Sequence, residues 1–203
     1  MLKAKSLYHL IVYSIFFIII LISFFTFIII NNAHEELQEK ITTLKEDYTN
    51  NQKALLKNYV NYVIKFIDYY YIENRDKFDE ETIQKNLILA LDHLNISSNP
   101  NEYIFIFDIN GNLIDNSNDK QEIGKNFLNY KDSKGKSVVK ELIEASKNSD
   151  GGFVNYFWSK PSLTKETNKI SYVKSYDRWS WTIGKGVYLD EIDRLIKQKG
   201  EEY

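Results

Sequence analysis

The sequence predicts an α+β fold: a membrane-spanning helix and a long stalk helix precede one compact domain with a central antiparallel sheet of about five strands. Three observations indicate this class. Residues 7–30 are apolar and free of Asp, Glu, Lys and Arg, residues 33–78 contain no Gly or Pro, and strand-like segments separated by turns dominate after residue 103. A run of strands flanked by helices is typical of α+β domains.

The apolar stretch from Leu7 to Ile30 is long enough to cross a membrane. A helix rises 1.5 Å per residue, the hydrocarbon core is about 30 Å thick, and only a helix satisfies its own backbone there. A secretory signal peptide is the alternative, but its apolar core runs to about 7–15 residues before small residues. This run is longer and ends in Ile30-Asn31-Asn32. The sequence therefore favours an uncleaved anchor.

Charge predicts the orientation of this anchor. Lys3 and Lys5 precede the span, and all 28 acidic residues follow it. Positive residues favour the cytoplasmic side, so we expect residues 1–6 in the cytoplasm and residues 31–203 in the periplasm, beside a bacterial inner membrane. The exported part carries 24 basic residues (26 less two) against 28 acids, a formal charge of −4. That balance argues against nucleic acid as a partner.

Two helices are predicted after the anchor. Apolar residues of the stalk helix, residues 33–78, recur at three- and four-residue steps, which is helical periodicity. This stripe could pack on its own domain, on a second subunit, or on both. A second helix is predicted over Glu80–Leu94, with Asp79 or the region of Thr82 as its cap.

The remaining segments predict the sheet. Tyr103–Phe107 is β-branched and aromatic throughout, which indicates a strand buried on both faces. Asn110-Gly111 is a hairpin signal, and the return strand is expected at Asn112–Asp115. Periodicity then predicts a helix at 137–147, strands at 152–159, 169–175 and 179–187, and a final helix at 190–203 leading toward a second membrane span.

Several segments in a fixed order carry a resemblance: Tyr103–Asp108 with Gly111, Ile123–Asn126, Asp132–Lys136, Gly152–Trp158, Lys169–Lys174 and Trp179–Tyr188. Together they resemble the single Cache domains of bacterial chemoreceptors and sensor kinases. The resemblance implies a PAS-like sensor domain over residues 31–189, with a ligand pocket on one face of the sheet and long helices on the other. It also implies ligands such as small organic acids. Many relatives carry a His shortly after the hairpin, where this chain has Asn116-Ser117.

Lysines and aromatic residues of the strands are the candidate ligand contacts. An anion in a partly dry cavity needs a cation or several N–H donors. Lys169 and Lys174 meet this need, and the resemblance favours Lys169. Because strict alternation places these two on opposite faces, only one would point into the pocket unless the strand is bulged. Each of these residues could instead serve plain core packing or a solvated face. The predicted set is Lys169, Lys174, Tyr103, Phe105, Asn116, Tyr156, Trp158 and Tyr172.

Other chemistry is not indicated by the sequence. The three His residues are scattered and Cys is absent, so no metal site is expected. Gly135-Lys136-Ser137 mimics the end of a phosphate-binding loop, but Tyr130 stands where the earlier Gly is required. We find no nucleophile–base pair, and we expect no catalytic residue, no cofactor and no enzyme.

Two classes of function follow. In the first, the chain is the sensor part of a homodimeric transmembrane receptor, in which a small carboxylate shifts the stalk helix relative to the C-terminal helix. The output would be chemotaxis, with a histidine kinase or a nucleotide cyclase as alternatives. In the second, the chain is a membrane-anchored, stand-alone periplasmic binding or interaction protein.

Overall fold

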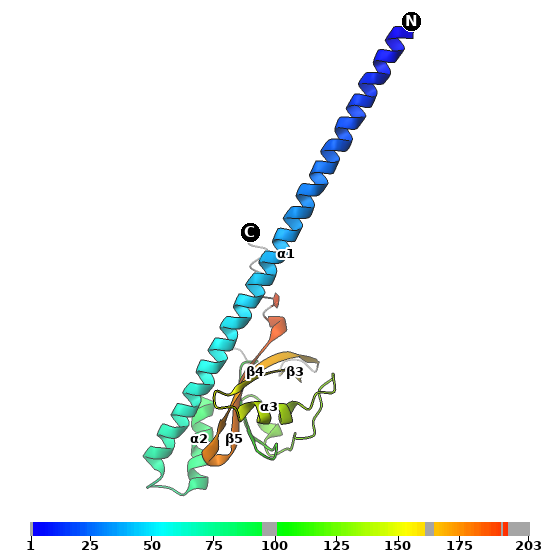
Figure 1. Ribbon diagram of the computed structural model, residues 1–203. Coiled ribbons are helices and arrows are strands. Elements are labelled where there is room, and N and C mark those ends of the chain that lie inside the picture. Colours follow the sequence, from blue (N-terminus) through cyan, green and yellow to red (C-terminus); the bar gives the residue numbers. More distant parts are fainter. Residues whose placement is uncertain (1, 95–100, 161–164, 192, 195–203) are drawn as a thin grey trace. The chain divides into compact units, whose positions relative to one another are not determined.

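The computed structural model describes residues 2–94, 101–160, 165–191 and 193–194. The chain divides into two units, Met1–Glu46 and Asp47–Tyr203. One helix, α1 (Leu2–Asn74), forms the first unit and continues into the second (Figure 1). The predicted span at 7–30 and the predicted stalk at 33–78 are therefore parts of a single helix.

The end of α1 lies at Asn74, so the prediction that the helix reaches residue 78 is wrong. The side-chain Nδ2 of Asn74 donates to the carbonyl of Tyr70 at 2.8 Å, a local bond of the kind that competes with helix continuation. A short turn follows, and the Asp79 side chain accepts from the backbone N of Thr82 at 2.9 Å. Asp79 thus caps α2 (Glu80–Leu94), whose predicted bounds are confirmed.

The N-terminal part of α1 is apolar on all sides. The large side chains from Ile11 to Ile30 are exposed, and an 18-residue stretch of this helix has a mean hydropathy of 2.8 with none of it buried. By length and composition, the helix fits a single membrane span.

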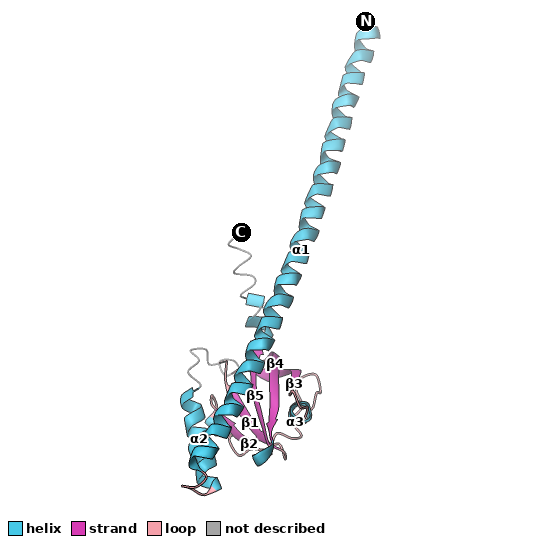
Figure 2. Cartoon of the chain, turned by 60° about the vertical axis from the view of Figure 1, so that its left-hand side comes forward, coloured by secondary structure: helices cyan, strands magenta, loops and turns pink. Residues whose placement is uncertain are grey.

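The second unit is built on one antiparallel sheet of five strands in the order β2-β1-β5-β4-β3 (Figure 2). The sheet and the α+β class are as predicted. The strands are β1 (Ile104–Asp108), β2 (Leu113–Asn116), β3 (Gly152–Ser159), β4 (Glu166–Tyr176) and β5 (Trp181–Tyr188).

The start of the last strand differs from the prediction. β5 begins at Trp181 rather than at Trp179, because Asp177–Trp179 form a 3₁₀ turn. Ser180 then adopts a left-handed conformation with φ of 51°, which reverses the chain before it pairs with β4.

The two faces of the sheet carry different layers (Figure 2). On one face, α1 residues such as Val60 and Ile67 pack with α2 residues such as Leu87 against Ile106 and Ile183. On the other face, α3 (Val138–Ser146) packs against aromatic residues of β1 and β3. This second layer covers only part of its face, which leaves room for a cavity.

The predicted helix at 190–203 lies largely outside the described residues. Residues 189–191 and 193–194 are helical, so the helical backbone begins at Leu189, directly after β5.

Candidate ligand-binding site

A cavity of about 560 Å³ lies on the α3 side of the sheet. Its apolar lining comes from Phe105, Phe107, Leu113, Phe127 and Leu142, and its aromatic side chains with polar tips are Tyr103, Tyr130, Tyr156 and Trp158. Its polar lining comes from Asn116, Asn118, Asp119, Gln121, Glu122 and Ser159, and two cations, Lys160 and Lys169, complete it. An apolar cavity of this size with a few placed polar groups is typical of small-molecule sites.

Lys169 is a buried cation at the wall of this cavity. It lies in β4 directly between Tyr156 of β3 and Tyr188 of β5, and only 1% of its surface is exposed. Its Nζ stands 3.9 Å from the ring centre of Tyr103 and 5.0 Å from that of Tyr188. Among the described residues, no carboxylate forms an ion pair with this ammonium. The aromatic rings supply only cation–π attraction.

Burial has a large effect on this ammonium. The pKa of Lys169 is lowered to about 7, mainly by loss of hydration; the charge of Glu191 opposes this shift and the charge of Lys185 adds to it. Gly186 on the neighbouring strand makes room for the side chain, since a Cβ there would stand 2.7 Å from Lys169 Cε and 2.1 Å from Ser171 Oγ. An anion in the cavity would form the ion pair with Lys169 that none of the described residues forms.

Six of the eight predicted site residues line the cavity: Lys169, Tyr103, Phe105, Asn116, Tyr156 and Trp158. Tyr156 shares a hydrogen bond of 2.8 Å with Ser171, and its ring packs edge-on to Trp158. These contacts fix the two side chains that share one face of β3, as the alternation predicted.

The other two predicted residues lie elsewhere. Tyr172 belongs to the core between the sheet and α1, and its hydroxyl donates to the carbonyl of Asp150. The Nζ of Lys174 donates to Asn61 Oδ1 of α1 at 3.4 Å. Lys169 and Lys174 therefore face opposite sides of β4, as their spacing predicted, and only Lys169 reaches the cavity.

Sequence reasoning missed Lys160, the second cation of the cavity. Its side chain is 7% exposed, and its Nζ stands 2.8 Å from Asp190 and 3.5 Å from Glu191. The alternation of β3 carried a signal for it, because Lys160 follows Tyr156 and Trp158 at two-residue steps. Phe107 likewise follows Tyr103 and Phe105 at two-residue steps, and it also lines the cavity.

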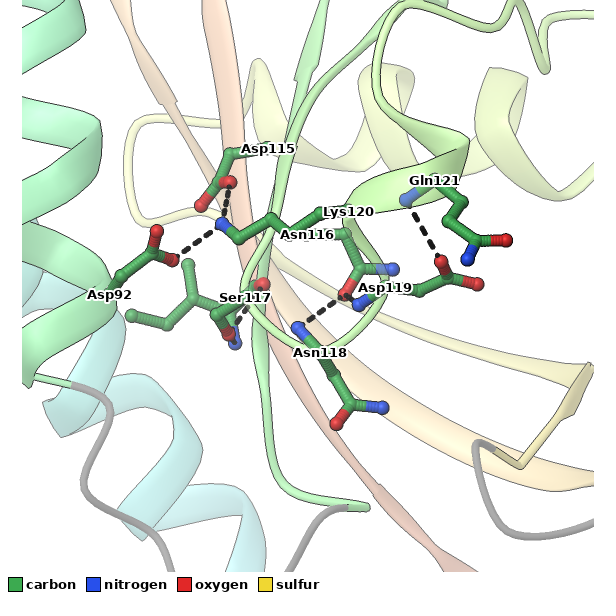
Figure 3. Close-up of polar contacts among 9 residues, drawn as sticks. Asp92, Asp115, Asn116, Ser117, Asn118, Asp119, Lys120 and Gln121 are labelled. Atoms are coloured by element: carbon green, nitrogen blue, oxygen red, sulfur yellow. Dashed lines mark hydrogen bonds and ion pairs between the residues drawn. The ribbon is translucent and has the colours of Figure 1, made fainter.

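Apart from Asn116, the polar part of the wall was also missed, because it comes from a connection without periodicity. Residues 117–122 follow β2 and include a short 3₁₀ turn at Lys120–Glu122. Lys120 points away from the cavity and stands 2.7 Å from Asp115 and 2.6 Å from Asp92 of α2 (Figure 3).

An antiparallel sheet with long helices on one face and, on the other, a cavity lined by a buried cation is typical of a domain that binds a small molecule. Residues 48–201 match the family of single Cache domains described as single Cache domain 2, and the chain belongs to this family. Its domains are the sensor modules of chemoreceptors and sensor kinases, and they bind ligands without enzymatic activity.

A named relative and two solved structures support this family assignment. The sensor histidine kinase MctS of Rhizobium johnstonii is 30% identical over 155 residues, which are 76% of this chain and 32% of the kinase. The chain thus spans about a third of that relative.

Two solved structures share the fold. A methyl-accepting chemotaxis protein from Vibrio parahaemolyticus is 25% identical with a TM-score of 0.65, over 75% of this chain and 99% of the other. A Cache chemosensory domain described for carboxylic acid recognition is 26% identical with a TM-score of 0.63, over 70% of this chain and 97% of the other.

Proposed function

We propose that this chain is the extracytoplasmic sensor of a transmembrane receptor and that it binds a small carboxylate in the cavity around Lys169. One observation carries the proposal: a fully buried ammonium lines the cavity and has no ion-pair partner among the described residues. A ligand carboxylate there would form a charge-assisted hydrogen bond in a dry environment. The similarity to a Cache domain that recognises carboxylic acids supports this ligand class.

The test is isothermal titration calorimetry of the full chain in detergent micelles, against monocarboxylates of two to five carbons, amino acids and amines. We expect at least one carboxylate to bind and Lys169→Met to weaken it at least about 100-fold, since a charged hydrogen bond in a buried site is lost.

Lys174→Met is the matched control, because this lysine faces α1 instead of the cavity. It should leave the affinity within about twofold. A folded chain that binds no carboxylate, or equal effects of the two substitutions, would refute the proposal.

The signal is proposed to leave the site through Lys160. This residue lines the cavity and pairs with Asp190 and Glu191 at the beginning of the C-terminal segment. A ligand anion would compete with these carboxylates for Lys160, so the ligand-free and ligand-bound states differ in how this segment is held.

The membrane arrangement is also part of the proposal. The apolar helix would form a single span of the inner membrane, with residues 1–6 inside and the sensor domain in the periplasm, as the flanking charges indicate. We propose a homodimer with a methyl-accepting chemotaxis output. A histidine kinase is the second candidate, because the 30% identical relative is a sensor histidine kinase.

A further inference from the structure

The cavity wall formed by Asn116–Glu122 carries negative charge in the same cavity as the buried lysine. Asp119 lines the same cavity as Lys169. Burial is the main cause that raises the pKa of Tyr103, and the charge of Asp119 adds to it. Asp119 therefore acts on the tyrosine whose ring lies 3.9 Å from the ammonium of Lys169.

This wall is held in place before any ligand arrives (Figure 3). The side-chain oxygen of Asn116 accepts from the backbone N of Asn118 at 3.1 Å and of Asp119 at 3.3 Å. Asp119 Oδ1 in turn accepts from the backbone N of Gln121 at 3.1 Å. Behind the wall, the ion pairs of Lys120 tie it to β2 and α2. A preorganised wall costs little free energy to order on binding.

Two charged groups of the cavity have no ion-pair partner among the described residues. Glu122 pairs with Lys125 at 2.6 Å, and Lys160 pairs with Asp190. Lys169, which is buried, forms no ion pair with a carboxylate, and Asp119, which is exposed, forms none with a cation within the described part of the chain. The site therefore presents one buried positive group and one negative group to the same ligand.

We propose that the cavity selects a ligand with two unlike ends, a carboxylate at Lys169 and an ammonium or N–H donor at Asp119. This inference rests on the proposed function and names its ligand class. Asp119 is then a specificity-determining residue, because it attracts the positive end and repels a second carboxylate. The volume of about 560 Å³ leaves room for an aliphatic body between the two ends, along Phe105 and Leu113.

The test compares isosteric ligands that differ only at the far end. Pentanoate, 4-aminobutanoate and glutarate carry a methyl, an ammonium and a carboxylate on the same three-methylene acid. Butanoate, 3-aminopropanoate and succinate form the two-methylene series. We expect, by calorimetry on the full chain at pH 7, that one amino acid binds at least about tenfold tighter than its methyl isostere, because its ammonium can donate a charge-assisted hydrogen bond to Asp119. Its dicarboxylate should bind most weakly, because Asp119 repels the second carboxylate.

Asp119→Asn should remove this preference. It should weaken the amino ligand about tenfold and leave the methyl isostere within about twofold, since only the amino ligand loses a charged partner. Glu144→Gln is the control, because it removes an acid that is exposed on α3 and paired with Lys147. It should change no affinity.

The outcomes separate the two proposals. Monocarboxylates that bind as tightly as their amino isosteres, or a preference that survives Asp119→Asn, overturn the bipolar ligand and leave the carboxylate sensor standing. Silence of all six compounds toward a chain whose circular dichroism shows it to be folded overturns the bipolar ligand. If acetate and propanoate do not bind either, the carboxylate sensor is overturned as well.

Discussion

Two opposing electrostatic effects act on the side chain of Lys169. Removing an ammonium from water is costly, and the rings of Tyr103, Tyr188 and Phe105 return only part of that cost through cation–π attraction. The residue is therefore poised between a charged and a neutral form near pH 7. A ligand carboxylate would shift this balance to the charged form, so binding and protonation are linked.

The affinity for a monocarboxylate such as propanoate should depend on pH. Above about pH 7 the free protein holds Lys169 neutral, so binding must take up a proton and affinity should fall about tenfold per pH unit up to the raised pKa of the complex. The acidic ligand stays ionised across this range. Titrations at pH 6, 7, 8 and 9, each in two buffers of different ionisation enthalpy, measure both the affinity and the proton uptake. A flat profile would contradict the linkage.

Lys169→Met should stabilise the ligand-free domain. The folded pKa lies below the ordinary lysine value, so the unfolded chain binds the proton more tightly and wild-type stability falls as pH drops from about 10.5 to 7. The gain from Met should thus be full at pH 6, on the order of 5 kcal/mol before lost cation–π attraction is subtracted, and less than half of that at pH 9. Thermal unfolding at both pH values measures it. A lower Tm for the variant at pH 6 would show that the ammonium is not destabilising.

At the scale of elements, the local sequence pattern predicted most of the helices and strands. The remaining features depend on contacts between segments that are distant in the sequence. The sheet, the three helices that flank it and the alternation within β3 follow from the sequence, because one face of each element is consistently apolar. Apart from Asn116, the polar wall up to Glu122 could not be predicted, since its position depends on Lys120 reaching Asp92 of α2, 28 residues earlier. The placement of Tyr172 away from the cavity could have been found, because it stands three positions after Lys169 and alternation puts such residues on opposite faces.

Lys120→Met should destabilise the domain more than Asp92→Asn does. Asp115 is fully buried, and its second carboxylate oxygen has no hydrogen-bond partner among the described residues, so loss of Lys120 leaves a buried charge uncompensated. We expect a cost of about 3 kcal/mol for Lys120→Met and less than about 1 kcal/mol for Asp92→Asn, where one bridge to a half-exposed lysine is lost. Urea denaturation measures both, and equal costs would argue against this role of Lys120.

At the scale of the whole molecule, the second unit leaves one side of α1 uncovered. Leu55, Tyr62 and Tyr69 recur every seven residues and are 53%, 64% and 63% exposed, while Val60 and Ile67 face the sheet. A seven-residue apolar repeat is the pattern of a helix seam between two chains. The proposed homodimer would bury this seam.

Tyr62→Glu should therefore weaken self-association. Placing a charge in the middle of an apolar helix seam should raise the dimer dissociation constant at least about tenfold. Lys85→Glu reverses the charge of an exposed lysine on α2 instead of α1 and serves as the control. Sedimentation equilibrium in density-matched detergent measures the association, and an unchanged constant would place any dimer contact elsewhere.

The strand order also determines when the sheet can be completed during folding. β1 pairs with β2 directly along the chain, but its other neighbour is β5, with Ile106 opposite Ile183. Contacts so distant in sequence form slowly and late. In the proposed export direction, the hairpin of β1 and β2 leaves the membrane first and keeps an unpaired apolar edge until the last strand emerges. The sheet can close only after Tyr188 has crossed, so the domain depends on protection from aggregation throughout its own translocation.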